Sequence, residues 1–261
     1  MKQCLNCETE LRGPYCHHCG QKGSTHRYSL KSLLTHELVH SLWHVDKSIL
    51  RNWWYVLLHP GREGHKNVAG KRAGQFPIVT LAVFATLFLL VAIYFRGEDE
   101  HMVVRFGNFD FSAWVRHNAK WLWLSMILLY ALSNVIFFRR PRYNLAEHIV
   151  LATYIYTGFV TVSAIFLFLY RSLPSEWVWL DWLRPVVYLG YLAMASWQTY
   201  RSFYDLAGWI WRFLFSFFCF WLILFVIILG IALGLRAGTG PASFQIHYSQ
   251  KNMPVLYHAA C

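Results

Sequence analysis

A run of twenty residues without a charged side chain, from Phe76 to Phe95, most constrains how this chain can fold. About twenty apolar residues in a helix are enough to cross the hydrocarbon core of a bilayer. The whole chain is 56% hydrophobic, and its apolar residues concentrate beyond residue 75. We therefore expect an integral membrane protein with a more polar N-terminal region. Because the chain opens with cysteines and not with a basic and then apolar segment, we expect this run to be an uncleaved anchor.

Four further apolar runs follow, so the sequence predicts an all-α bundle of about five transmembrane helices. The fourth run is the least apolar, because Asp181, Arg184 and Pro185 precede it and Arg201 lies near its end. Trp and Tyr gather at the ends of the runs, as they do at membrane–water interfaces. The expected spans cover residues 76–95, 121–138, 149–170, 186–203 and 213–235.

Basic residues are distributed unevenly between the two sides of such a bundle. Of the 24 Lys and Arg residues, sixteen fall on the side of the N-terminal region and eight fall on the side of the C-terminal tail. The positive-inside rule assigns the basic side to the cytoplasm. We therefore expect a multi-pass protein of the bacterial inner membrane, with its N-terminus in the cytoplasm and its C-terminus outside.

Four cysteines occupy the first nineteen residues as two pairs of equal spacing, Cys4-x2-Cys7 and Cys16-x2-Cys19. Each pair suits a tight turn, and Gly20 follows the last cysteine where such a turn needs a small residue. Two facing turns place four thiolates at the corners of a tetrahedron, which is the coordination that structural Zn²⁺ takes. The sequence therefore predicts a zinc ribbon over residues 1–24 with these four cysteines as the metal ligands.

The predicted ribbon is too small to fold by burying apolar surface, so the metal would supply its stability. A bend at Gly13-Pro14 is expected to bring the two pairs together. Four cysteine ligands leave no open coordination position, which indicates a structural site. A disulfide or redox pair is the alternative chemistry, and His17 and His18 are the alternative ligands. A reducing cytoplasm and the paired spacing favour four thiolates and a metal.

Residues 25–75 predict two amphipathic helices and a connector ahead of the first span. The first helix follows Ser29 as its N-cap and carries leucines at three-to-four spacing. The second helix is expected to begin at Asp46 and to stop at Pro60-Gly61. Its tryptophans and flanking basic residues are typical of a helix that lies in the headgroup region. The segment from Gly61 to Gly74 is expected to be a glycine-rich, basic connector.

The first of these helices also contains a sequence with catalytic associations, His36-Glu37-Leu38-Val39-His40. Histidines at i and i+4 share one helix face and can bind one Zn²⁺, with the glutamate activating a water molecule. The pattern is also common by chance in a chain with 13 histidines, and no third ligand follows it nearby. A polar helix face is the favoured interpretation, and a membrane-associated metalloprotease or accessory metal binding remains the alternative.

Other charged groups give weaker indications. The net charge of +11 is spread along the chain, so basic cytoplasmic loops and anionic headgroups account for it better than nucleic acid does. No ionisable residue falls near the middle of an expected span, which argues against a coupled small-solute transporter. Glu147-His148 opens the third span, where capping and charge pairing are favoured over a site shared with Gly70-Lys71-Arg72.

The order of these features resembles a bacterial domain-of-unknown-function family of polytopic membrane proteins with an N-terminal zinc ribbon. The resemblance covers nearly the whole chain and implies the same architecture without implying an activity. Fewer histidines follow Glu147-His148 than the family pattern implies. The motifs that carry it are C-x-N-C, Tyr15-Cys16-x-x-Cys19-Gly20-Gln21, Pro60-Gly61, Gly70-Lys71-Arg72, Glu147-His148 and the Tyr200–Tyr204 segment.

The sequence thus predicts four regions: a zinc ribbon (1–24), juxtamembrane helices with a basic connector (25–75), a transmembrane bundle (76–238) and a tail (239–261). We expect a non-catalytic role, in which the cytoplasmic ribbon mediates protein interaction or assembly or the bundle serves as an accessory subunit of a membrane complex. The expected partners are the lipid bilayer and a protein partner, without nucleic acid, and the expected cofactor is structural Zn²⁺.

Overall fold

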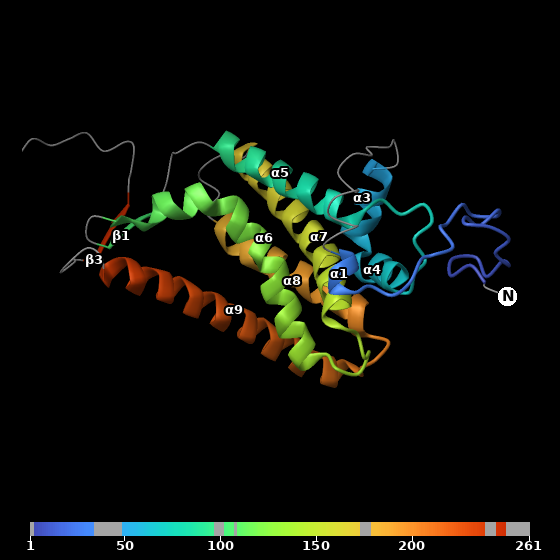
Figure 1. Cartoon of the computed structure of the whole chain (residues 1–261). Helices are drawn as coiled ribbons and strands as arrows, with labels where there is room; N and C mark the ends of the chain where they lie inside the picture. The colour runs from blue at the N-terminus through green and yellow to red at the C-terminus, as the bar shows by residue number, and fades with distance from the viewer. Residues whose placement is uncertain are drawn as a thin grey trace, which may run out of the picture.

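The structure is a computed structural model that describes residues 3–33, 49–96, 102–106, 109–172, 179–237 and 244–248. Five long helices among the described residues pack side by side, and each covers most or all of one predicted apolar run (Figure 1). The cysteine-containing N-terminal residues lie at one end of this bundle. The five helices are α5 (Ile78–Arg96), α6 (Phe111–Phe137), α7 (Leu145–Ser172), α8 (Trp179–Tyr200) and α9 (Leu206–Ala237).

Three helices in the described part of the chain are long and apolar enough to cross a membrane: α5, α7 and α9. The other two fall short of the predicted five spans for reasons visible in their sequences. In the described part of α6 the apolar segment is Leu124–Phe137, and Arg116 and Lys120 lie in the first half of the helix. Helix α8 begins with Asp181 and Arg184 among its first residues.

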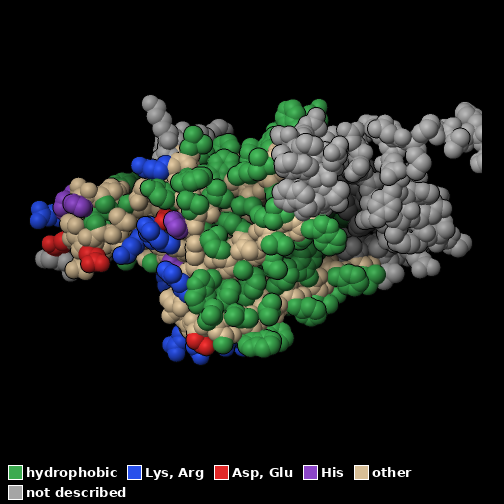
Figure 2. All heavy atoms as spheres, turned by 180° about the vertical axis from the view of Figure 1, so that it is seen from behind, with side chains coloured by type: hydrophobic (Ala, Val, Ile, Leu, Met, Phe, Trp, Pro, Cys, Tyr) green, Lys and Arg blue, Asp and Glu red, His purple; other side chains and the backbone are tan. Residues whose placement is uncertain are grey.

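Helix α7 forms the centre of the bundle, whereas α9 lies at its edge. Of their apolar segments, 78% of the residues of α7 are buried but only 22% of those of α9. Helix α7 packs against α5, α6 and α8 and also against the short helices near the N-terminus. The exposed apolar side chains form a broad surface on the side of the bundle in Figure 2, while charged groups gather at one end. This distribution suits helices surrounded by lipid.

A small antiparallel sheet of order β2-β1-β3 accompanies the helices. Strand β1 (Met102–Phe106) pairs with β2 (Phe109–Asp110) and with β3 (Phe244–Tyr248). The sheet lies at the opposite end of the bundle from the N-terminus (Figure 1). The sheet joins the segment between α5 and α6 to the tail after α9. The five-span prediction puts these two segments on the same side of the membrane. The alternating apolar and polar residues of Phe244-Gln-Ile-His-Tyr248 are the signal for β3.

The described residues of the juxtamembrane region form three short helices: α1 (Leu30–Ser32), α3 (Ile49–Leu58) and α4 (Pro60–Val68). Helix α1 begins directly after Ser29, as predicted, and most of its expected leucine stripe lies outside the described residues, as does Asp46. Helix α3 ends at Leu58, just before Pro60-Gly61, as predicted, but the prediction that a connector follows is wrong. A second helix begins at Pro60, because proline fits the first turn of a helix, where its missing N–H costs nothing.

The glycines of α4 allow close helix packing and are not parts of a loose linker. A Cβ atom on Gly61 would lie 2.4 Å from the backbone of Gln198 and Thr199 in α8. A Cβ atom on Gly64 would lie 2.9 Å from Leu151 in α7. Helix α4 therefore packs closely against α7 and α8, near the ends of these helices that face the N-terminal region.

Helix α3 is amphipathic in the way that the sequence predicts. Trp53 faces the bundle, and its Nε1 donates a hydrogen bond of 2.8 Å to Thr161 Oγ1 in α7. On the other face, Leu50 and Trp54 are 73% and 59% exposed. One side of α3 therefore packs on protein, and the other side offers apolar surface to the surroundings.

Candidate metal centre and its attachment to the bundle

Residues 3–24, here called the cysteine module, contain two turns with the same backbone hydrogen bonds. In the first knuckle (residues 3–10), the amides of Cys4 and Glu8 bond to the carbonyls of Thr9 and Cys4 at 2.9 Å each. In the second knuckle (residues 15–22), Cys16 N bonds to Gln21 O at 2.8 Å and Gly20 N to Cys16 O at 2.9 Å. Each turn thus orients its two thiols in the same way.

The residue after the second cysteine of each knuckle is left-handed. Glu8 has φ 64° and Gly20 has φ 74°. Glycine adopts this conformation without a steric penalty, whereas glutamate does not. The prediction that the position after Cys19 needs a small residue therefore has a backbone reason, and the first knuckle meets the same demand with a less suitable residue.

The four predicted ligands come together. Their sulfur atoms all lie within 4.8 Å of one another, with Cys4 Sγ 3.6 Å from Cys19 Sγ and Cys7 Sγ 3.5 Å from Cys16 Sγ. Zn–S bonds of about 2.3 Å arranged tetrahedrally place sulfurs about 3.8 Å apart, so these spacings fit one tetrahedral metal ion. They are too long for the S–S bond of about 2.05 Å in a disulfide.

The surroundings of the thiols favour metal binding without an open coordination position. Cys4 and Cys16 are buried, and the exposed His17 and His18 do not belong to the cluster. Hydrogen bonds with Thr9 lower the pKa of the Cys7 thiol to about 5, which favours the thiolate that a metal needs. The Gln21 amide lowers the pKa of Cys19, but burial and the neighbouring thiols together raise it to about 11.

Gln21 joins the cysteine module to the segment that precedes the first span. Its side chain is buried, and Nε2 donates a 2.8 Å hydrogen bond to Gly70 O. Its Oε1 accepts hydrogen bonds from the amides of Arg72 at 2.9 Å and Ala73 at 3.1 Å. One amide side chain thereby forms hydrogen bonds with three backbone groups, in the place that a neighbouring β-strand would otherwise take.

The first knuckle contacts the same segment through Leu5. Gly70 has φ 84°, and a Cβ atom there would lie 2.7 Å from Leu5 Cδ1. The left-handed backbone of Gly70 favours glycine, and a Cβ atom there would also push the end of the Leu5 side chain aside. Both knuckles thus attach to residues 70–73.

Arg72 holds the chain that leaves the cysteine module. Its guanidinium carbon lies 3.7 Å from the centre of the Tyr28 ring, which is a cation–π contact. The same group donates to Asn67 O at 3.2 Å and to His26 O at 3.1 Å. Tyr28 in turn donates a 2.6 Å hydrogen bond to Asn67 Oδ1 in α4.

Glu147 links the N-terminal region to the central helix. Arg27 donates two hydrogen bonds of 2.7 Å to its carboxylate, in the bidentate geometry that charge pairing favours. These bonds raise the pKa of Arg27 further above its ordinary value. Glu147 also accepts a bond from Asn144 N while Asn144 Oδ1 accepts one from Glu147 N, each 2.9 Å. This is a capping box at the start of α7, so the prediction of capping and charge pairing is confirmed.

His65 ties α4 to the end of α8 and to the loop before α7. Its Nε2 donates to the carbonyl of Thr199, and its Nδ1 accepts a 2.9 Å hydrogen bond from the Tyr143 hydroxyl. Burial lowers the pKa of His65, so the imidazole stays neutral in this tautomer. Burial also raises the pKa of Tyr143 to about 12, which keeps its hydroxyl a donor.

Sequence reasoning identified the four thiols but missed Gln21, Arg27 and Asn67 as the residues that attach them to the bundle. Gln21 and Gly70-Lys71-Arg72 stood out as motifs, yet nothing in their spacing showed that they touch. His36, Glu37 and His40 lie outside the described residues, so the structure does not test the alternative metal site there.

Compared with protein-family models, with curated proteins and with solved structures, the chain matches none of them. The resemblance to a zinc-ribbon membrane family therefore stays a prediction.

Proposed function

We propose that the chain is a non-catalytic membrane protein whose cysteine module binds structural Zn²⁺ and mediates protein interaction or assembly. The observation that carries this proposal is the way in which the module is attached. Its four sulfurs face one another, and Leu5 and Gln21 hold it on residues 70–73. A closed four-thiolate site has no position for a substrate or water, so its chemistry is to hold a surface in place.

The outward surface of the module suits contact with a protein. Tyr15 is 61% exposed, and Arg12, His17 and His18 are exposed beside it. Tyrosine, histidine and arginine combine apolar area with hydrogen-bonding groups, and tyrosine and arginine are enriched where protein interfaces are energetically important. Figure 2 shows charged and histidine side chains gathered at this end of the molecule.

The same proposal places the module in the bacterial cytoplasm with five crossings of the inner membrane. An odd number of crossings puts the termini on opposite sides. The pairing of β3 with β1 supports this, because it brings the tail to the end of the bundle opposite the N-terminus. The shorter apolar segment of α6 and the proline-containing α8 would complete the five spans with support from neighbouring helices.

The first test is the zinc content of the detergent-purified protein by elemental analysis. We expect one zinc per chain, which Cys16→Ser removes and which Glu37→Gln and His40→Ala leave unchanged. A second metal that is lost with His40→Ala but kept with Glu37→Gln would contradict the proposal and favour the metalloprotease alternative.

The second test is site-specific photocrosslinking in cells at Tyr15, with a matched probe at Leu214 on the exposed face of α9. We expect the Tyr15 probe to give one discrete protein adduct that disappears in the Cys16→Ser background. Equal labelling of proteins from both positions, or lipid adducts alone, would argue against an interaction surface on the module. Solute flux through reconstituted vesicles above the protein-free control would instead favour a transporter.

A further inference from the structure

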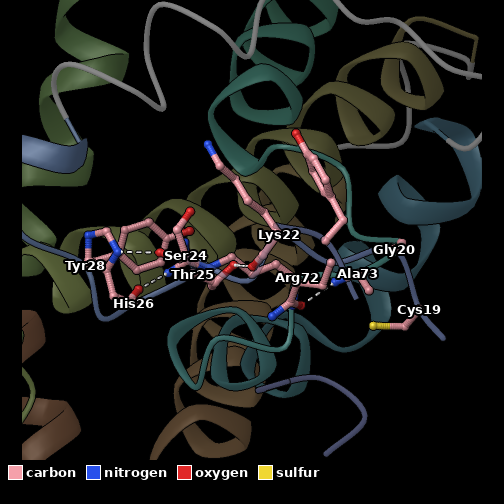
Figure 3. A pocket seen from close by; sticks show the side chains of 12 residues that line it. Cys19, Gly20, Lys22, Ser24, Thr25, His26, Tyr28, Arg72 and Ala73 are labelled. Carbon is pink, nitrogen blue, oxygen red and sulfur yellow. Dashed lines mark hydrogen bonds between the residues drawn. The ribbon is translucent and has the colours of Figure 1, made fainter. Parts of the chain in front are cut away.

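A cavity of about 530 Å³ lies between the cysteine module and the segment before α5 (Figure 3). Its walls come from the second knuckle, from residues 22–28 and from residues 72–74. Its volume falls in the range of sites for small molecules and headgroups, about 300–1,000 Å³. It is distinct from the cluster of four sulfurs, although Cys19 forms part of one edge.

The charge of this cavity is positive. Lys22, His26 and Arg72 line it, and no aspartate or glutamate does. The ion pairs among the described residues join Arg27 to Glu147 and join Arg62 and Lys66 to Glu63, so neither Lys22 nor Arg72 is neutralised. The potential in the cavity therefore attracts an anion.

The guanidinium of Arg72 is fixed in place before any ligand arrives. Stacking on Tyr28 covers one face of the guanidinium plane. Hydrogen bonds to the carbonyls of Asn67 and His26 use two of its five N–H groups. Three N–H groups stay available in a fixed plane, which is the arrangement that recognises phosphate oxygens. A fixed group loses little conformational entropy on binding.

Further donors complete the site. Figure 3 shows Lys22, Ser24 and Thr25 lining the same cavity as Arg72 and Tyr28. Lys22 is exposed and its ammonium group is a mobile point charge, while the Ser24 hydroxyl is a neutral donor. Thr25 is already committed, because its hydroxyl bonds to Lys22 O at 2.6 Å.

From this geometry we propose that the cavity binds a phosphate group, with Arg72 and Lys22 as its main ligands. The phosphate belongs either to an anionic lipid headgroup or to a soluble phosphate. The first helix long enough to span a membrane begins at Ile78, only four residues beyond Gly74 at the cavity edge, which places the site near headgroup level. A bound phosphate would bridge the second knuckle to residues 72–74 and so strengthen their contact.

The test uses the full-length, zinc-loaded protein. In maltoside micelles, inorganic phosphate is titrated by calorimetry at low salt. We expect saturable binding that Lys22→Gln weakens by about fivefold, the effect of one lost charge contact. Lys71→Gln is the matched control, because Lys71 is an exposed neighbour that does not line the cavity. We expect it to change the affinity by less than about twofold.

A second arm identifies the source of the phosphate. Hydrogen exchange of peptides covering residues 20–28 and 70–75 is compared between phosphatidylcholine nanodiscs and nanodiscs that contain phosphatidic acid. Protection by phosphatidic acid without binding of inorganic phosphate assigns the site to a lipid headgroup, and the reverse assigns it to a soluble phosphate. Equal weakening by Lys22→Gln and Lys71→Gln, or no response to either probe, would overturn the proposal.

Discussion

The two knuckles have the same backbone conformation but differ in the contacts of the side chain that follows the left-handed residue. Each closes with two hydrogen bonds of 2.8–2.9 Å, and each has a left-handed residue after its second cysteine. They differ at the residue that follows. In the first knuckle, Thr9 lies 3.3 Å from Cys7 Sγ and supports a thiol. In the second, Gln21 reaches away from the thiols to Gly70, Arg72 and Ala73.

The same type of turn therefore both gathers the metal ligands and, through the residue that follows it, attaches the module to the bundle. The cysteine spacing and the turn suffice to gather the sulfurs, since both knuckles do so alike. Attachment to the bundle depends instead on side chains outside the ligand set, with Gln21 making three of the hydrogen bonds. Metal binding and docking are therefore separable by mutation, and the following predictions order such changes by the size of their effect.

Replacing a metal-ligating cysteine should have the largest effect, because both knuckles should then unfold. We expect Cys16→Ser to lower zinc from one to near zero per chain, because structural zinc supplies on the order of 10 kcal/mol or more to such small modules. Hydrogen exchange should then show residues 3–25 unprotected. The peptides of α7 should keep their protection, since its core does not include the thiols. Zinc retained at wild-type level in Cys16→Ser would contradict the assigned ligand set.

Gln21→Ala should separate docking from metal binding. It leaves the Gly70 carbonyl and two amides without their partner, which costs about 2–4 kcal/mol in the free energy of undocking. We expect faster hydrogen exchange at Arg72 and Ala73 with zinc still at one per chain. Thr9→Ala is the matched change in the first knuckle and should cost no more than about 1 kcal/mol. If both variants behave alike, the two knuckles do not differ in function.

Gly70→Ala should weaken docking from the other side of the same contact. The left-handed backbone and the approach of Leu5 together cost about 1–3 kcal/mol. In the double variant with Leu5→Ala, the part due to crowding should be recovered and the backbone part should persist. Limited proteolysis between residues 22 and 28 measures undocking. A fully additive double variant would show that Leu5 and Gly70 do not interact.

The smallest effects should come from exchanging the left-handed residues. Gly20→Ala should destabilise the second knuckle by about 1 kcal/mol, because alanine disfavours a φ of 74°. Glu8→Gly should relieve the same strain at φ 64°, offset in part by the entropy of glycine in the unfolded chain. Competition for zinc with a chelator ranks the variants. A stabilising Gly20→Ala would show that strain in this turn has no energetic weight.

Features that depend on nearby residues could be predicted from the sequence. The ligand set spans residues 4–19, the start of α1 follows Ser29, and the α7 capping box spans four residues. Each rests on spacing, so the pattern alone shows the chemistry. The long apolar helices were predictable for the same reason, because hydrophobicity is a property of each segment.

Contacts between distant residues could not be predicted. Gln21 meets residues 49 to 52 positions away, and no periodicity encodes such a pairing. The expectation of a connector after Pro60-Gly61 was wrong because the residues that end α3 also suit the start of α4. Only the tight approach of α4 to Gln198 shows why glycine is needed there.

The ion pair between Arg27 and Glu147 can form only after the four cysteines of the module have been synthesised. Its two ends are 120 residues apart, whereas the four thiols are complete by residue 19. At about 5–20 residues per second, a ribosome needs about 6–24 s to make the intervening chain. The module therefore has its metal ligands well before its anchor on the third apolar helix exists. The module can therefore dock on residues 70–73 as soon as these residues are made, whereas the bond that ties Arg27 to the central helix forms only after residue 147 has been made.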